Sequence, residues 1–151
     1  MIYIKNSQRA IKINANQLKT DLQIILDALK YSNFDISVLI TTNKTIRAYN
    51  RDYRQKDTPT DILSFPYHPE LQAGKRIRVK EIEDRNLGDL VISAEYVSKE
   101  ARELKVTFEA RMKKLLVHGV CHLLGYDHII DADWRRMRAK EGFLLKKLMN
   151  I

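Results

Sequence analysis

The chain has one cysteine, four histidines and no long apolar run. Each of these low counts limits the class of protein that the chain can belong to. The single cysteine, Cys121, excludes an internal disulfide and fits a reducing compartment. No apolar stretch is long enough to cross a bilayer, and neither a secretory signal nor an Arg-rich transit peptide opens the sequence. We therefore expect a cytoplasmic protein that does not use a membrane.

Internal repeats and low-complexity segments are also absent, and the length predicts a single domain over residues 1–151. Hydrophobic residues make up 44% and charged residues 30%, which argues against an intrinsically disordered chain. The formal net charge is +8. A basic surface favours a polyanionic partner, most often nucleic acid or the ribosome, although a set of solvated charges would give the same balance.

Short β-branched segments alternate with amphipathic segments along the chain. Extended or hairpin-like structure is expected over 3–13. Strands are expected over 35–40, 62–65 and 87–93, with Pro66 ending the strand at 62–65. Helices are expected over 16–29, 42–53, 94–104, 108–124 and 131–148. This order predicts an α/β or α+β fold, in which helices cover a small mixed β-sheet. The polar and basic segment 67–86 is the best candidate for a mobile excursion.

Polar residues predict where the helices begin, and apolar rows predict which face each helix buries. Asn16, Thr42 and Ser93 are the expected N-caps of the first three helices, and Asp131 or Asp133 is that of the last. The apolar row of the third helix is expected to consist of Ala94, Val97, Ala101 and Leu104. That of the last helix is expected to consist of Trp134, Met137, Leu144, Leu145 and Leu148.

Three of the four histidines fall within eleven residues, in the segment HGVCHLLGYDH at 118–128. His118 and His122 are four residues apart, so they share one helix face. Gly125 can then turn the chain sharply, which lets His128 return to the same point. Two imidazoles at a fixed spacing and a third from another direction can hold a divalent metal. The sequence therefore predicts a metal site made by His118, His122 and His128.

The helix that carries His118 and His122 also has a face for the core. At about 100° per residue, Arg111 and Leu115 fall on the histidine side, and the other apolar residues fall largely opposite. A lone histidine on an apolar face is more often a hydrogen-bonded core residue. Three histidines at this spacing favour metal ligands that face a cleft.

The histidine spacing matches HExxHxxGxxH, the metzincin peptidase pattern, so the central helix is expected to be zincin-like. That pattern has a glutamate, the general base, directly after the first histidine. Gly119 stands there, so the metal geometry is kept without the peptidase base. Three imidazoles leave a fourth position open to water or substrate. The sequence leaves open whether Cys121, Asp127 or Glu141 touches the site, and Cys121 is better explained as a small core residue.

Three segments together resemble the YbeY endoribonucleases, also called rRNA maturation factors. HGVCHLLGYDH resembles the family's signature, NRDYRQKDTPTDILSFP at 50–66 its second motif, and LGDLVIS at 87–93 its third. They occur in the expected order, and the resemblance covers nearly the whole chain. Cys121 stands where Leu or Thr is commoner, and the C-terminal helix is more basic than usual.

The resemblance implies an α/β fold with a zinc site, in which His118, His122 and His128 match the zinc ligands. It implies a single-strand-preferring endoribonuclease that acts in rRNA (16S-type) maturation and ribosome quality control. It also implies that Arg54 contacts RNA phosphate near the metal. The implied partners are ribosomal RNA, a small-subunit ribosomal protein and the ribosome-assembly GTPase Era. We expect one Zn²⁺ per chain, although imidazoles also suit Ni²⁺ and other divalent metals.

Arginine chemistry supports a phosphate contact, because a guanidinium binds phosphate bidentately and stabilises charge in the transition state. Arg54 begins a polar loop in the second motif, and Arg111 on the histidine side of its helix is a second candidate. Thr60, Asp61 and Ser64 are expected mainly to make turn and strand-end hydrogen bonds. Four basic residues of the segment 67–86 are further candidates, each of them more often a solvated charge: Lys75, Arg76, Arg78 and Lys80.

The leading hypothesis is metal-assisted hydrolysis of an RNA phosphodiester, with Arg54 and His118 in the catalytic centre and no general base assigned. One alternative is a zincin-like hydrolase that acts on peptides, which needs another carboxylate in place of the missing glutamate. The other is a non-enzymatic ribosome-assembly factor, in which the metal only folds the site. Strong salt dependence of RNA binding fits the first and third hypotheses alike.

Overall fold

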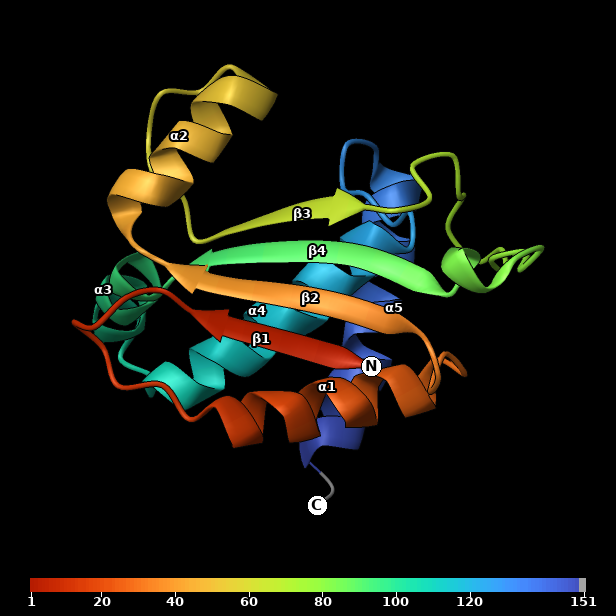
Figure 1. The fold of residues 1–151 in the computed structure, drawn as a ribbon, viewed down its shortest axis with the longest axis horizontal. Coiled ribbons are helices and arrows are strands. Elements are labelled where there is room, and N and C mark those ends of the chain that lie inside the picture. The colour runs from red at the N-terminus through yellow and green to blue at the C-terminus, as the bar shows by residue number, and fades with distance from the viewer. Residues whose placement is uncertain (150–151) are drawn as a thin grey trace.

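Four strands and five α-helices make up the computed structural model, which describes residues 1–149 (Figure 1). The strands are β1 (Ile2–Asn6), β2 (Asp35–Thr41), β3 (Ile62–Pro66) and β4 (Asn86–Ser93). The helices are α1 (Ala15–Ala28), α2 (Asn43–Arg54), α3 (Ala94–Leu104), α4 (Phe108–Leu123) and α5 (Asp131–Met149), with a short 3-10 helix, η1 (Ile82–Asp84). The expected α/β fold is confirmed. None of these described helices is long and apolar enough to cross a bilayer.

The sheet has the strand order β1-β2-β4-β3, with β3 antiparallel to β4 and the other pairs parallel. Parallel strands need a crossover connection, and α1 supplies it between β1 and β2. The prediction of extended structure over 3–13 was therefore wrong beyond Asn6, where β1 ends. The turn that follows is held by the Gln8 side chain, which hydrogen-bonds to the Asn6 side chain and the Ile11 backbone.

The main core lies between one face of the sheet and the helices α1, α4 and α5. Residues at alternate positions of a strand point to one face, and Ile36, Val38 and Ile40 of β2 enter this core with Leu90 and Ile92 of β4. Figure 1 shows α4 and α5 passing behind the sheet. Apolar residues of α1 and three of the five residues predicted for the inner row of α5 are buried here: Leu18, Leu22, Ile25, Leu26, Met137, Leu144 and Leu148.

The opposite face of the sheet is covered only in part by the described residues. Ile46 of α2 packs on Leu63 of β3 and Val91 of β4 in a second, small cluster. Figure 1 shows α2 by itself beside β3, apart from α4 and α5. A hollow lies on the remaining part of this face, over β1 and β2.

Side-chain caps begin the helices, as the sequence predicted for two of them. Thr42 and Ser93 cap α2 and α3 by accepting a backbone N–H from the residue three positions further on. Asn16 does not cap α1, because the cap lies two residues earlier than predicted. Asn14 caps it, because its backbone is extended (φ −93°, ψ 91°) and its side chain accepts the N–H of Gln17.

Helix ends account for the other differences. Leu104 is the last residue of α3 and is 56% exposed, and Trp134 in the first turn of α5 is 47% exposed, so both were wrongly predicted to be buried. Helix ends project past the layer on which the helix packs. Because α5 begins at Asp131, neither Asp131 nor Asp133 is its cap, and both lie in the first turn, where carboxylates favour the helix dipole.

The segment 67–86 is anchored through its middle. Arg76 donates hydrogen bonds to the backbone oxygens of Leu29 and Lys30 at the end of α1, 2.7 and 2.8 Å away. Its guanidinium also lies 3.9 Å from the centre of the Tyr31 ring. The Tyr31 hydroxyl in turn accepts the N–H of Ile77. Arg76 therefore has a structural role, and the mobility of the segment stays a prediction.

Candidate metal centre

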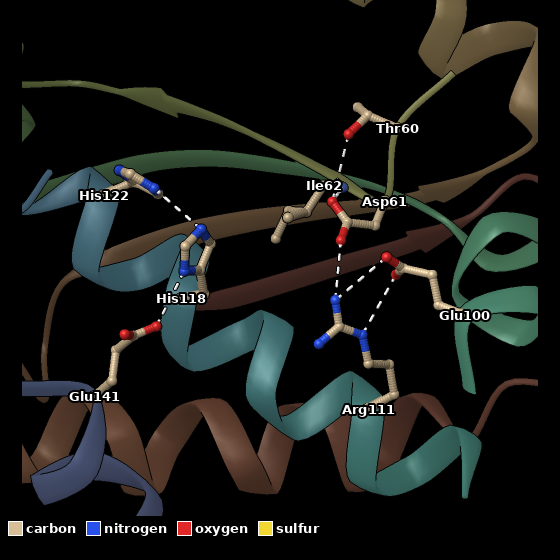
Figure 2. A network of polar contacts seen from close by, with 8 residues as sticks. All are labelled: Thr60, Asp61, Ile62, Glu100, Arg111, His118, His122 and Glu141. Atoms are coloured by element: carbon tan, nitrogen blue, oxygen red, sulfur yellow. Dashed lines mark hydrogen bonds and ion pairs between the residues drawn. The ribbon is translucent and has the colours of Figure 1, made fainter. Parts of the chain in front are cut away.

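The last two turns of α4 bring His118 and His122 together. Their Nε2 atoms lie 3.1 Å apart and their ring centres 4.5 Å apart (Figure 2). Two nitrogens bound to one tetrahedral zinc lie about 3.3 Å apart, given Zn–N distances of about 2.0–2.1 Å. The spacing predicted from the sequence therefore gives a pair of imidazoles that fits a divalent metal.

A tight turn after α4 returns the third histidine to this pair. Gly125 has φ +88°, and a Cβ at this position would lie 2.2 Å from the backbone oxygen of Leu71. Only glycine fits such a turn without strain. The ring of His128 then lies 5.9 Å from that of His118 and 5.4 Å from that of His122, centre to centre.

The neighbours of His118 and His122 favour the neutral imidazoles that a metal needs. Oε2 of Glu141, on α5, lies 3.0 Å from Nδ1 of His118 and is positioned to accept a hydrogen bond from an N–H at Nδ1. In the neutral ring this leaves Nε2 unprotonated. The pKa of His122 is lowered, first by burial and then by the charges of His118 and His128. A hydrogen bond to the Tyr126 backbone opposes this shift. A ligand imidazole must be neutral, so the Glu141 contact and the lowered pKa of His122 both favour metal binding.

Asp127 joins the histidines more closely than the sequence indicated. The ligand atoms of His122, Asp127 and His128 all lie within 4.8 Å of one another, and His118 stands outside this trio. An Asp127 carboxylate oxygen also accepts the backbone N–H of His128 at 2.7 Å. The structure thus supports a metal site at the end of α4 and adds a carboxylate to its candidate ligands. The ligand set of three histidines remains a prediction.

Gly119 lies where a peptidase would carry its general base, and it faces the sheet. A Cβ there would lie 2.7 Å from Cδ1 of Ile62 and 2.8 Å from a methyl carbon of Leu90. The Gly119 carbonyl oxygen accepts a hydrogen bond from the Ser64 hydroxyl, at 3.3 Å. A larger side chain at this position would therefore have to push the methyl ends of Ile62 and Leu90 aside.

Cys121 is part of the core. Its side chain is fully buried, and burial raises the pKa of its thiol to about 12. Metal ligation requires the thiolate, which is disfavoured at neutral pH by such a pKa. The expectation of a small core residue is therefore supported.

Arg111 lies on the histidine side of α4, but two carboxylates already hold it. Its guanidinium is 3.2 Å from Oδ2 of Asp61 and 3.3 Å from Oε2 of Glu100, and all three side chains are less than a quarter exposed (Figure 2). Burial and the charge of Asp61 raise the pKa of Glu100, and Arg111 opposes this shift. The two carboxylates engage Nε and Nη2 of Arg111, so part of its charge is already neutralised, and the phosphate contact at Arg111 stays a prediction.

A hollow of about 510 Å³ lies between α4 and α5, and His118 and Glu141 line it. Lys114 and Arg138 add positive charge to its walls, which also include Arg111. The cleft expected along the histidine side of α4 is therefore present.

Residues of the second motif make the local bonds that the sequence suggested. The Asp61 carboxylate accepts the N–H of Ile62 at 2.7 Å and the Thr60 hydroxyl at 3.4 Å. Arg54 is the last residue of α2 and not part of the loop, and its side chain is exposed. Figure 1 shows α2 on the other side of β3 from α4. The phosphate role of Arg54 stays a prediction.

Comparisons with known proteins decide the family. The model of the family described as "Endoribonuclease YbeY" matches residues 3–149. The chain belongs to this family of endoribonucleases. A relative named Endoribonuclease YbeY from Homo sapiens is 35% identical over 147 residues, which cover 97% of this chain and 87% of that protein. The protein of the same name from Aquifex aeolicus is 39% identical over 138 residues, covering 91% and 85%.

One solved structure supports the fold. The solution structure of TM1509 from Thermotoga maritima superposes with a TM-score of 0.59 over 99% of this chain and 93% of that chain. At 20% sequence identity, this likeness shows the fold alone. The α/β architecture therefore agrees with a known protein as well as with the sequence pattern.

Sequence reasoning missed one part of the site and left another open. It did not foresee the pairing of Arg111 with Asp61 and Glu100, because the partners lie 50 and 11 residues away along the chain. It named Glu141 as a possible partner of a ligand histidine or an exposed residue, and the structure shows its contact with His118, 23 positions away. No spacing rule connects such distant residues, so only the packing of α3 and α5 on α4 reveals them.

Proposed function

We propose that this chain is a metal-dependent endoribonuclease that prefers single-stranded RNA and acts in rRNA (16S-type) maturation and ribosome quality control. The observation that carries the proposal is the convergence of His118, His122 and His128 at the end of α4, in a member of the YbeY family. The proposal treats residues 1–151 as one catalytic domain.

The proposed cofactor is one Zn²⁺ per chain, held by His118, His122 and His128 with Asp127 beside them. Imidazole nitrogens and a carboxylate oxygen suit zinc, and they also bind Ni²⁺. A bound divalent metal supplies a Lewis acid for a phosphoryl oxygen and lowers the pKa of a water molecule.

The protein's own groups prepare the site for a phosphodiester. Glu141 accepts a hydrogen bond from Nδ1–H of His118 and so fixes the orientation of the ring. Asp127, grouped with His122 and His128, is proposed to accept a proton from a water molecule there. Arg54 is proposed to bind an RNA phosphate bidentately through its exposed guanidinium.

A cleavage assay on a single-stranded rRNA fragment tests the proposal. We expect His118→Ala to lower kcat/KM by at least about 100-fold and Arg54→Glu by about 10- to 1,000-fold, the range for losing a group that stabilises transition-state charge. Arg9→Glu, at an exposed loop position, is the matched control and should stay near wild type. Equal cleavage by all four proteins would point to a contaminating nuclease and refute the assignment.

Peptide hydrolysis is the second candidate, because the histidine pattern is shared with metzincins. The absence of a side chain at Gly119 argues against it, since the position that carries the general base in that pattern holds no carboxylate. Turnover of a quenched peptide library that a chelator abolishes would revive this candidate. A third candidate, a ribosome-assembly factor with a structural metal, predicts that folded histidine variants keep RNA binding and cellular function.

We further propose partners and a location that the family resemblance implies. Ribosomal RNA is the proposed substrate, and a small-subunit ribosomal protein and an Era-type GTPase are proposed to guide the chain to it. The net charge of +8 supports a polyanionic partner. The cytoplasm is the proposed location, and pull-down from a ribosome-containing lysate with and without ribonuclease treatment tests these contacts.

A further inference from the structure

A hollow of about 810 Å³ lies on the sheet face that α2 leaves open. Tyr3, Ser37, Asp89 and Phe65 lie in register across all four strands and line it. Their neighbours along the strands, such as Leu90, belong to the main core. Because side chains alternate between faces, this row points away from α1, α4 and α5. The hollow is therefore separated from the histidines by the sheet itself.

Aromatic rings form two sides of this hollow. On one side, Tyr53 packs edge-on against Phe65 with 5.2 Å between ring centres, and it stacks on Tyr49 at 6.2 Å. On the other side stands Tyr3 of the edge strand β1. Tyr53 is 65% exposed and Tyr3 is 49% exposed. Tyr3 lies on β1 and Tyr53 on α2, and a large part of each side chain is accessible to a ligand.

The charges around the hollow favour a polyanion with apolar rings. Lys5 of β1 and Lys19 of α1 are exposed and line it, and Asp89 is its one acidic lining residue among those described. Two copies of this chain would each bring a net charge of +8, which opposes self-association through this face. Nucleic acid instead combines phosphates for the lysines with bases for the tyrosines.

We propose that this face binds single-stranded RNA, with bases stacked on Tyr3 and Tyr53 and phosphates near Lys5 and Lys19. Four-stranded sheets with exposed aromatic side chains bind RNA in this way, since an unpaired base can lie flat on a ring. Asp89 on the floor accepts hydrogen bonds from base amino groups. The inference rests on the proposed function, because it names a second RNA-binding surface, separate from the histidine site, on a chain proposed to cleave RNA.

Fluorescence anisotropy with metal-loaded protein and a labelled, 2′-O-methylated single-stranded RNA tests this surface. The integrity of the RNA is checked on a gel after each titration. Stacking contributes about 1–3 kcal/mol per base, so Tyr3→Ala and Tyr53→Ala should each weaken binding by about 5- to 150-fold. Tyr53→Phe should stay within about 3-fold of wild type, because it keeps the ring.

Tyr67→Ala is the matched control, since Tyr67 is 46% exposed but does not line the hollow. It should bind as wild type does, and thermal melts should show that all variants are folded. Wild-type affinity in both Tyr3→Ala and Tyr53→Ala would overturn the proposal. A dimer that Tyr53→Ala dissociates would also overturn it, since the face would then be an interface between copies.

The binding readout is independent of cleavage, so the two proposals can fail separately. Wild-type protein that binds the 2′-O-methylated RNA through the tyrosines but does not cleave the unmodified RNA would remove the proposed function alone. Cleavage that depends on His118, with RNA affinity insensitive to both tyrosines, would remove the surface alone.

Discussion

At the scale of single residues, the contact between His118 and Glu141 orients one histidine of the candidate metal centre. A carboxylate on one ring nitrogen directs the lone pair of the other toward the neighbouring imidazoles. The Glu141 side chain is only 20% exposed, so water competes weakly for it. Of the three residues that the sequence left open, Glu141 and Asp127 are therefore the two that join the histidines.

Removing this carboxylate should weaken metal binding. We predict that Glu141→Ala lowers zinc affinity by about 10- to 100-fold, the usual effect of losing a group that orients a ligand histidine. Competition with a chromophoric zinc chelator measures it. Glu103→Ala changes an exposed glutamate of α3 and should have no such effect. An unchanged affinity in Glu141→Ala would show that the contact does not orient a ligand.

Cys121 gives a second prediction at this scale. Because its thiol is fully buried and its pKa is raised to about 12, almost no thiolate forms at pH 8. We predict that Ellman's reagent labels less than about a tenth of the native protein in the time that labels the unfolded protein completely. Fast labelling of folded, metal-free protein would contradict burial and reopen a ligand role.

The elements meet at Arg111, which ties α4 to α3 and to the residue before β3. Removing the guanidinium leaves Asp61 and Glu100 close together and mostly buried. We predict that Arg111→Met lowers the free energy of unfolding by about 1–3 kcal/mol at pH 7, below the range for fully buried pairs because of their partial exposure. The exposed pair of Arg47 and Asp57 is the control, and Arg47→Met should leave the free energy of unfolding nearly unchanged.

Acid should partly rescue the Arg111→Met variant. The pKa of Glu100 is already raised above its ordinary value of 4.5, and loss of the cation that lowers it raises it further. A carboxyl with a higher pKa in the folded than in the unfolded state destabilises the protein at high pH. That penalty disappears as the pH falls through the folded pKa. Urea unfolding at several pH values should show a deficit that shrinks below neutral pH, and a growing deficit would contradict this assignment.

The turn after α4 tests how the third histidine is placed. Gly125→Ala forces a Cβ to within 2.2 Å of the Leu71 oxygen at a φ of +88°, so we predict a loss of at least about 1–2 kcal/mol and weaker zinc binding. Gly142→Ala is the control, because a Cβ at this helical position meets nothing within 4 Å. That change should stabilise the protein by about 0.5–1 kcal/mol. Equal thermal melts for both variants would show that the turn is not strained by a side chain.

Local spacing explains which elements the sequence could predict. The pairing of His118 with His122 depends only on the helical period, and the caps Thr42 and Ser93 depend on residues three positions away. The exposure of Leu104 and Trp134 depends instead on how far a neighbouring layer extends, and no local pattern contains that information.

At the scale of the whole molecule, the sheet separates the two surfaces that are proposed to be functional. The histidines lie at the end of α4 behind the sheet, and the aromatic hollow lies on the face beside α2. The composition and motifs predicted an α/β chain that acts on RNA, but not this arrangement. The row Tyr3, Ser37, Asp89 and Phe65 comes from four separate strands, so it exists only once the strand order and register are known.

The metal content of protein purified without a histidine tag tests the central claim most directly. Elemental analysis by mass spectrometry should find about one zinc per chain in the wild type. His118→Ala and His122→Ala should each lose most of it, provided that thermal melts show them folded. Wild-type protein without any bound divalent metal, or folded variants that keep a full equivalent, would contradict a metal centre at the end of α4.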